Sequence, residues 1–268
     1  MCKVENLTSS SRRLLFLGTG TSAGVPMLGC DCPVCVSTDP RNQRTRPSVL
    51  VTLPQGNLLI DTTPEMRLQL LREGIRKVHA IAFTHGHADH LFGLDDARLF
   101  PKAIGGPVPV YCEKEVEESI RSVFHYAFAE HLLHLPPGHV PKIEFERIEP
   151  ETPFQVLSQT ILPIRLDHGR FRVVGFRIGN LAYCTDVNRI PERSWPLLEG
   201  LDFLVLDALR REPHPTHFNL EQSLEVVERL QPRQTYLTHI SHDLDHGPIE
   251  SILPPKVALA YDGLAFDF

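Results

Sequence analysis

The chain has 268 residues, of which 42% are hydrophobic and 22% are charged, and these values are ordinary for a soluble globular protein. A net charge of −6 excludes an overall electrostatic attraction to nucleic acid or to anionic lipid, and the sequence holds no apolar run long enough to span a membrane. The beginning of the sequence lacks the apolar core of a signal peptide. We therefore expect a cytoplasmic protein with reduced cysteines, without a membrane partner and without a nucleic-acid partner.

Short apolar runs recur along the whole chain and predict buried strands. Each run is rich in valine, isoleucine or leucine and is bounded by glycine, proline or polar residues. The runs are residues 14–18, 48–53, 57–61, 80–84, 108–112, 161–166, 171–178, 181–185, 203–209, 235–238 and 257–263.

Three stretches between these runs have the composition of helices. Residues 63–74 carry proline in the first turn and glycine at the end, where helices favour them. Residues 113–134 are acidic at their start, and residues 219–230 begin with Asn219 as a plausible N-cap. Strands with interspersed helices predict an α/β protein with covered sheets.

Several apolar runs end in a histidine or an aspartate. His85, His168, Asp186 and His239 each follow such a run. Strand ends that lie side by side at one edge of a sheet bring their side chains together, and rigid scaffolds commonly carry functional residues there. Taken singly, each of these residues is more often an ordinary polar residue in a loop.

The densest cluster of potential ligands is His85-x-His87-x-Asp89-His90. On an extended loop, His85 and His87 can chelate one ion, while Asp89 and His90, at the start of a helix expected from His90 onward, can face a second ion. Imidazole and carboxylate ligands suit Zn, Mn or Fe. The alternative is a polar loop with exposed histidines. Four residues cannot complete two sites, so the later strand-end residues are expected to supply the rest.

With these later residues included, the pattern resembles the metallo-β-lactamase superfamily over nearly the whole chain. The resemblance implies an αββα four-layer sandwich formed by one domain, residues 1–268, with two divalent metals, Mn or Zn, at one edge of the sheets. It implies that His85, His87 and His168 hold the first metal, that Asp89, His90 and His239 hold the second, and that Asp186 bridges the two. Paired cations lower the pKa of a shared water and stabilise charge in an in-line displacement.

The segment "PHPTHF" offers His214 and His217 as proton donors. A departing alkoxide is a poor anion, so an acid near neutral pKa helps it to leave, and histidine is suitable. His217 immediately precedes the expected helix start, although idle histidines in an exposed proline-rich loop are an equal alternative. The segment is similar to the phosphodiesterase branch of the superfamily, which implies that His217 acts on the leaving group. His214 receives no role.

The motif Cys30-x-Cys32-x-x-Cys35 predicts a structural zinc site that lacks its fourth ligand. A surface thiol cluster and a redox pair are the alternatives. His242, three residues after His239, is the fourth ligand that we favour, because it would tie the N-terminal loop to the active-site loop. Other cysteines that could complete the site are Cys2, Cys112 and Cys184.

The triple cysteine, His242 and "HPTHF" together resemble the PhnP group of cyclic phosphodiesterases. The resemblance implies hydrolysis of a small cyclic phosphodiester, such as the phosphoribosyl 1,2-cyclic phosphate of phosphonate breakdown. The alternatives are a phosphodiesterase acting on RNA or 2′,3′-cyclic nucleotides, a glyoxalase-type thioesterase and a non-catalytic metal-binding scaffold. A basic RNA-binding surface is not evident at this net charge.

Several residues carry two interpretations. Asp61 can orient a ligand histidine or cap the following helix, and Asp207 has the same ambiguity. His131 and His134 are expected on one solvated helix face. Residues 113–141 can cover the active site or form a homodimer interface, and the sequence does not distinguish these.

Overall fold

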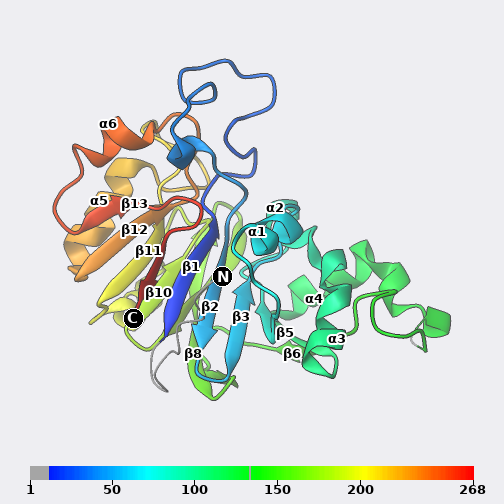
Figure 1. The fold of residues 1–268 in the computed structure, drawn as a ribbon. Helices are drawn as coiled ribbons and strands as arrows, with labels where there is room; N and C mark the ends of the chain where they lie inside the picture. Colours follow the sequence, from blue (N-terminus) through cyan, green and yellow to red (C-terminus); the bar gives the residue numbers. More distant parts are fainter. Residues whose placement is uncertain (1–11, 133) are drawn as a thin grey trace.

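A computed structural model describes residues 12–132 and 134–268. Two seven-stranded β-sheets pack face to face, and helices cover the outer face of each sheet (Figure 1). This arrangement confirms the predicted αββα sandwich. Cys2, one of the candidate fourth zinc ligands, lies outside the described residues, as does most of the N-terminal stretch on which the cytoplasmic expectation depends.

Each sheet combines an antiparallel half with a parallel half. In the first sheet, strands β3 to β6 run parallel and the others antiparallel, while in the second sheet β10 to β13 run parallel. The first sheet has the order β14 (Ala265–Asp267), β1 (Arg13–Gly18), β2 (Ser48–Leu53), β3 (Gly56–Ile60), β4 (Ala80–Ala82), β5 (Val108–Cys112) and β6 (Ile143–Arg147). The second has the order β13 (Val257–Leu259), β12 (Gln234–Thr238), β11 (Phe203–Asp207), β10 (Leu181–Cys184), β9 (Phe171–Ile178), β8 (Gln159–His168) and β7 (Phe154–Val156).

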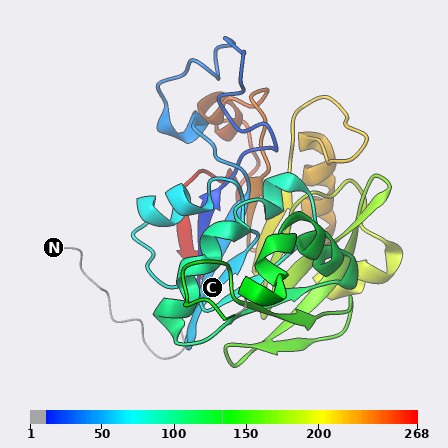
Figure 2. The same cartoon turned by 90° about the vertical axis from the view of Figure 1, so that its right-hand side faces the viewer.

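The helices form the two outer layers. Figure 2 brings the layer over the first sheet to the front. The α-helices are α1 (Met66–Arg72), α2 (Ala88–Leu91), α3 (Phe100–Ile104), α4 (Lys114–Val123), α5 (Leu220–Leu230) and α6 (His246–Glu250), and the 3₁₀ turns are η1 (Pro40–Asn42), η2 (Leu94–Leu99), η3 (His125–Phe128), η4 (Glu130–Leu132) and η5 (Glu192–Leu198). Over the residues that the structure describes, each of these helices is too short or too polar to cross a membrane.

The strands are apolar on both faces because both faces are covered. In β10, Leu181 and Tyr183 face the core between the sheets, whereas Ala182 and Cys184 face the helical layer around α5. All four are at most 1% exposed. This double burial explains why the strands appear in the sequence as continuous apolar runs and not as alternating patterns.

Two helix starts can be compared with their predictions. Asn219 caps α5 as expected, since its Oδ1 accepts from the backbone N of Gln222 at 2.9 Å and the Gln222 side chain accepts from Asn219 N at 3.0 Å. The helix expected from His90 begins earlier, at Ala88, with His87 at the N-cap position. Asp89 and His90 therefore lie within the first turn of α2.

The single helix predicted over residues 113–134 is wrong in its second half. α4 ends at Val123, and the two 3₁₀ turns η3 and η4 follow it. The sequence after Val123 is rich in aromatic residues and histidine, which have weaker helix propensity. Phe124 and Ala127 are both buried against the first sheet. A 3₁₀ turn places residues three apart on one side, so burial of both side chains favours the tighter turn.

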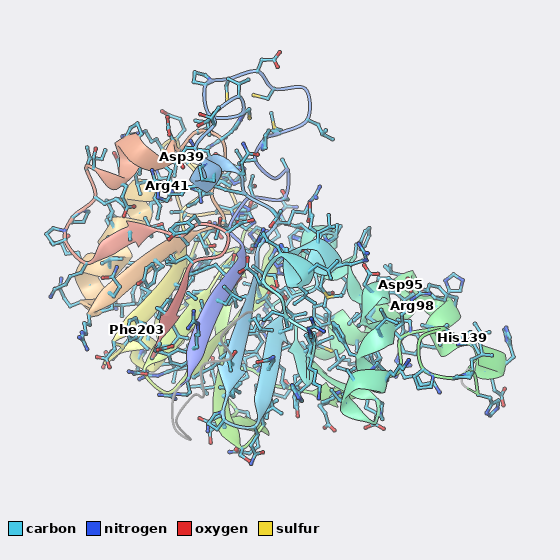
Figure 3. All side chains as sticks on the ribbon, viewed as in Figure 1. Asp39, Arg41, Asp95, Arg98, His139 and Phe203 are labelled. Atoms are coloured by element: carbon cyan, nitrogen blue, oxygen red, sulfur yellow. The ribbon has the colours of Figure 1, made fainter. Side chains whose placement is uncertain are left out.

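The turn η3 is tied to η2 by a hydrogen bond from the Tyr126 hydroxyl to Asp95, and Arg98 links η2 to the segment that follows η4. Arg98 pairs with Asp95 and donates from Nη1 to the carbonyl oxygen of His139 at 3.1 Å (Figure 3). His131 and His134 are exposed, as expected. They do not share a helix face, because His134 lies beyond the end of η4.

The core between the sheets provides a stability prediction. Leu58 in β3 is fully buried there, so Leu58→Ala should lower the free energy of unfolding by about 2–5 kcal/mol through lost burial and a residual cavity. Leu68→Ala is the matched control, because Leu68 is 61% exposed on α1 and should cost about 0.5 kcal/mol or less. Urea unfolding followed by circular dichroism measures both values. Equal losses would contradict this description of the core.

Candidate metal centre

The histidines and aspartates predicted at strand ends converge at one edge of the sandwich. His168 is the last residue of β8, and His239 directly follows β12. Asp186 lies two residues beyond β10, and His85 lies three residues beyond β4. Because these strands belong to both sheets, their ends meet between the two, and the α2 turn carries the remaining residues of the motif to the same place.

The first group of potential ligands is His85, His87 and His168. Their ligand atoms lie within 4.8 Å of one another. His168 Nδ1 donates to the carbonyl oxygen of Thr216 at 2.6 Å, and His85 Nδ1 lies 3.0 Å from Thr84 Oγ1, which leaves each Nε2 for the group. Burial lowers the pKa of all three histidines. The rings are therefore neutral at pH 7, which is the form that binds a metal.

The second group is Asp89, His90, Asp186 and His239, whose ligand atoms also lie within 4.8 Å of one another. His90 Nε2 is 3.1 Å from Asp186 Oδ2 and 3.4 Å from Asp89 Oδ2. His239 Nε2 is 3.2 Å from Asp186 Oδ1. His168 Nε2 lies 4.0 Å from the same oxygen, so Asp186 stands between the two groups.

Asp61 contacts a candidate ligand and does not cap a helix. Its Oδ2 accepts from His90 Nδ1 at 2.7 Å, and its two oxygens accept from the backbone N and the hydroxyl of Thr84, each at 2.8 Å. The N-cap position of α1 is Glu65, whose side chain makes no capping hydrogen bond. Of the two interpretations of Asp61, the structure shows the one in which it orients the ring of His90.

The two groups fit divalent cations. Among the described residues, the buried Nε2 atoms of His85, His90 and His239 have no hydrogen-bond partner, and burying such atoms unpaired is costly. Although burial opposes it, the carboxylate of Asp186 raises the pKa of His239 to about 10. This shift shows how strongly the buried carboxylates Asp89 and Asp186 favour positive charge beside them. Bound cations would supply that charge and satisfy the ring nitrogens.

Three of these residues have a left-handed backbone. Asp61, Asp186 and His239 have φ angles of 65°, 53° and 58°. Aspartate and histidine are among the non-glycine residues that adopt this conformation more readily, and strain of this kind gathers at functional sites. Each residue lies just beyond a strand, so the turn directs its side chain across the strand ends.

His217 lies beside both groups and is held by Asp207. His217 Nδ1 donates to Asp207 Oδ2 at 2.7 Å, and the same oxygen accepts from the backbone N of Val187 at 2.9 Å. A ligand atom of His217 lies within 4.8 Å of those of His168 and Asp186. Asp207 is fully buried. Of the two interpretations of Asp207, orienting a histidine or capping a helix, the structure therefore shows the first.

His214 is a neighbour of His217, and their ring centroids are 5.2 Å apart. Its Nδ1 lies 3.3 Å from the hydroxyl of Thr216. Nothing in these contacts gives His214 a chemical task, and it keeps no assigned role.

The three clustered cysteines surround His242. The Sγ atoms of Cys30, Cys32 and Cys35 lie 3.1, 3.5 and 3.4 Å from His242 Nδ1. Tetrahedral zinc with ordinary Zn–S and Zn–N bonds would separate sulfur and nitrogen by about 3.6 Å. The four ligand atoms lie within 4.8 Å of one another, so the group fits one zinc ion.

The other cysteines of the described chain lie elsewhere. Cys112 and Cys184 are fully buried in β5 and β10, where burial raises the pKa of each thiol to about 12. Within the cluster, a hydrogen bond from the backbone of Cys35 lowers the pKa of Cys32 to about 7, which favours its metal-binding thiolate, whereas burial raises the pKa of Cys35 to about 11.

A cavity of about 470 Å³ adjoins His85 and His87, and we call it the side cavity. One wall is the start of α4, so part of the segment 113–141 lines the candidate site. The lining residues are His85, Gly86, His87, Glu113, Glu115, Val116, Ser119, Arg165, Arg170, Phe171 and Arg172.

Known proteins are similar to this chain in sequence or in fold. A diphosphatase of the PhnP family, known from a crystal structure, is 44% identical with a TM-score of 0.89, and the match covers 96% of this chain and 97% of that one. Zn²⁺-bound PqqB from Methylobacterium extorquens has a TM-score of 0.78 over 96% of this chain and 100% of that one, but at 19% identity it shows the fold alone.

An octanoyltransferase of Porphyromonas gingivalis is 37% identical over 258 residues, which are 94% of this chain and 51% of that protein. The chain thus spans about half the length of this relative. The model of the beta-lactamase superfamily domain matches residues 56–240, which include every residue of the two groups of potential ligands. The chain belongs to the metallo-β-lactamase superfamily.

Proposed function

We propose that the protein is a dinuclear metal-dependent phosphodiesterase that hydrolyses a small cyclic phosphodiester such as phosphoribosyl 1,2-cyclic phosphate. The observation that carries the proposal is the buried pair of Asp207 and His217, which sets an imidazole beside both groups of potential ligands. The 44% identity to a diphosphatase of the PhnP family supports chemistry at phosphorus.

The proposed ligands divide between two metals, with Mn or Zn compatible with the nitrogen and oxygen donors. His85, His87 and His168 would hold one cation, Asp89, His90 and His239 the other, and Asp186 both. When bound, two such cations supply positive charge for the phosphate ester and lower the pKa of water. His90 is oriented by Asp61, which fixes the direction of its free nitrogen.

In this proposal His217 is the acid that protonates the leaving oxygen. Because Nδ1 donates to Asp207, the ring is fixed with Nε2 available for proton transfer. The carboxylate also compensates the positive charge of the ring while both nitrogens carry protons. Asp207 is thus a positioning residue, and His217 is the residue that contacts the departing group.

The alternatives account less well for this pair. A thioester releases a thiol, which leaves readily as an anion and has little need of an acid. A metal-binding scaffold without activity would not require an oriented histidine next to its metals. Long RNA substrates call for a basic surface, whereas the chain has a net charge of −6.

Substitution of His217 tests the proposed acid. His217→Ala should lower kcat about 10²- to 10⁴-fold on a cyclic ribose phosphate, whose leaving group is an alkoxide. The loss should be much smaller on bis-p-nitrophenyl phosphate, whose nitrophenolate leaves unaided. His131→Ala is the matched control, since His131 is an exposed residue of η4 that lies outside both groups of potential ligands and outside the lining of the side cavity. Equal losses on both diesters, or efficient thioester cleavage by the wild type, would contradict the assignment.

Asp61 offers a test of the metal centre itself. Asp61→Asn keeps the size of the side chain and tolerates the left-handed backbone, but it weakens the hydrogen bond that orients His90. We expect the affinity for the catalytic metals to fall about 10- to 100-fold, as for other residues that support a ligand. Competition with a chromogenic chelator measures this affinity. Unchanged affinity would show that His90 does not depend on Asp61.

We further propose a structural zinc ion held by Cys30, Cys32, Cys35 and His242. One zinc per chain should survive mild chelation in the wild type and be lost in His242→Ala, with a lower melting temperature, because such zinc sites contribute to folding. Elemental analysis after dialysis measures the zinc, and His131→Ala again serves as the control. If His242→Ala retains this zinc in full, His242 is not a ligand.

A further inference from the structure

Two of the three clustered cysteines are arranged as a dithiol that can close into a disulfide. Cys32 and Cys35 form a Cys-x-x-Cys motif at the tip of the loop of residues 19–47, which projects from the edge of the sandwich (Figure 1). Val36 N donates to the carbonyl oxygen of Cys32 at 3.1 Å, so both cysteines belong to one turn. Their Sγ atoms lie within 4.8 Å of each other, and a small movement of the side chains brings them to the S–S bond length of about 2.05 Å.

The two thiols differ in their exposure to solvent. Cys32 is partly exposed, whereas Cys35 is buried and packs in a small apolar cluster with Val25 and Val34. Each sulfur accepts a hydrogen bond from a backbone N, Cys32 from Cys35 at 3.4 Å and Cys35 from Met27 at 3.3 Å. Such hydrogen bonds stabilise the thiolate, which is the reactive form. Cys32 is therefore the sulfur that a reagent in solution reaches first, and Cys35 is the neighbour placed to react next.

The other cysteines of the described chain are less suitable partners for Cys32. A disulfide to Cys30, which is separated by one residue, closes a tighter ring than a disulfide to Cys35, which is separated by two, and strain makes a disulfide easier to reduce. Cys112 and Cys184 are fully buried in β5 and β10. Oxidation of the described cysteines is thus confined to the loop tip.

We propose that Cys32 and Cys35 are a reversible oxidation site, which hydrogen peroxide converts to a disulfide and a thiol reductant converts back. The Cys32 thiolate attacks one oxygen of the peroxide and becomes a sulfenic acid, while the O–O bond breaks and hydroxide leaves. The Cys35 thiolate then attacks the sulfenic sulfur, which forms the S–S bond and releases a second hydroxide. The two sulfurs lose two electrons, and the peroxide gains them. Two external thiols reverse the change by exchange and become a disulfide themselves.

This oxidation removes two of the four ligands of the structural zinc, and in this respect the inference rests on the zinc site proposed above. Cys30 and His242 remain, and two ligands are too few for a closed tetrahedral site. The base of the loop stays attached, because Ile240 N donates to the carbonyl oxygen of Thr19 at 2.9 Å and Thr21 N donates to that of Ile240 at 3.1 Å. The oxidised protein is expected to remain folded and to release its zinc.

Peptide mapping identifies the disulfide. The zinc-loaded protein is treated with hydrogen peroxide, its remaining thiols are alkylated after denaturation, and the chain is cut by a protease that cleaves before aspartate. Cleavage before Asp31 and before Asp39 yields one peptide that contains Cys32 and Cys35, and it leaves Cys30 in the preceding peptide. The first peptide should lack two hydrogen atoms and carry no alkyl group, while Cys30 is alkylated. A disulfide that joins the two peptides would contradict the proposal.

A trapping experiment tests the order of attack. In Cys35→Ser the disulfide cannot form, so dimedone, which reacts with sulfenic acids, should label Cys32. In Cys32→Ser the buried Cys35 should remain unlabelled. Cys112→Ala is the matched control, because Cys112 is fully buried outside the loop and its loss should leave the disulfide unchanged. Labelling of Cys35 in preference to Cys32 would contradict the order.

Zinc release separates this inference from the proposed zinc site. With Mn loaded in the two groups of potential ligands, a chromogenic indicator should detect about one zinc per chain after peroxide and its return to the protein after dithiothreitol. If the cluster binds no zinc while Cys32 and Cys35 still form the disulfide, the zinc site fails and the oxidation site stands. If the zinc is bound and both thiols are intact after peroxide, the oxidation site is overturned and the zinc site stands.

Discussion

The candidate site depends on the burial of the Asp186 carboxylate between the two sheets. Asp186 is 2% exposed, and its two oxygens lie 3.1 Å from His90 and 3.2 Å from His239. The charge of a buried carboxylate must be compensated by positive charge or by hydrogen bonds, and the imidazole groups that surround Asp186 can supply both. The imidazole rings around Asp186 must therefore direct a nitrogen atom toward its carboxylate. The surrounding elements of the fold must hold each ring in that orientation.

That support comes from both sheets. A chain of contacts crosses the sandwich, and in order it joins Asp61 after β3, His90 in α2, Asp186 after β10, His239 after β12, His217, and Asp207 at the end of β11. Because the first member belongs to one sheet and the last to the other, their spacing depends on the apolar core between the sheets. The packing of the two sheets therefore sets the distances between the candidate ligands, and a shift of one sheet relative to the other would move these side chains apart.

The features that can be predicted from the sequence are those that depend on residues close together in the chain. Buried strands were recognisable from their apolar runs, and the histidines and aspartates that follow those runs were expected to gather at one edge, whereas their division between two metals came only from the resemblance to a known superfamily. The roles of Asp61 and Asp207 could not be predicted, because orienting a histidine and capping a helix look the same in sequence. The helix break at Phe124 and the cavity beside Arg170 and Arg172 depend on which side chains meet across the chain. Tertiary contacts, which a single sequence does not display, decide each of these.

The loop of residues 19–47 connects the cysteine cluster with the segment that carries the candidate ligand His239. Its base is fixed by Arg44, which is buried and donates from Nη1 to the carbonyl oxygen of Ala260 at 2.6 Å and from Nη2 to His246 Nδ1 at 3.0 Å. Its tip meets His242 through the cysteines. His242 is three residues from the candidate ligand His239. The segment that carries His239 is therefore held by contacts with the base of the loop and by contacts with its cysteines. The protein hydrogen bonds hold the base without metal, so the proposed zinc would be needed only at the tip, where the loop has too little core of its own.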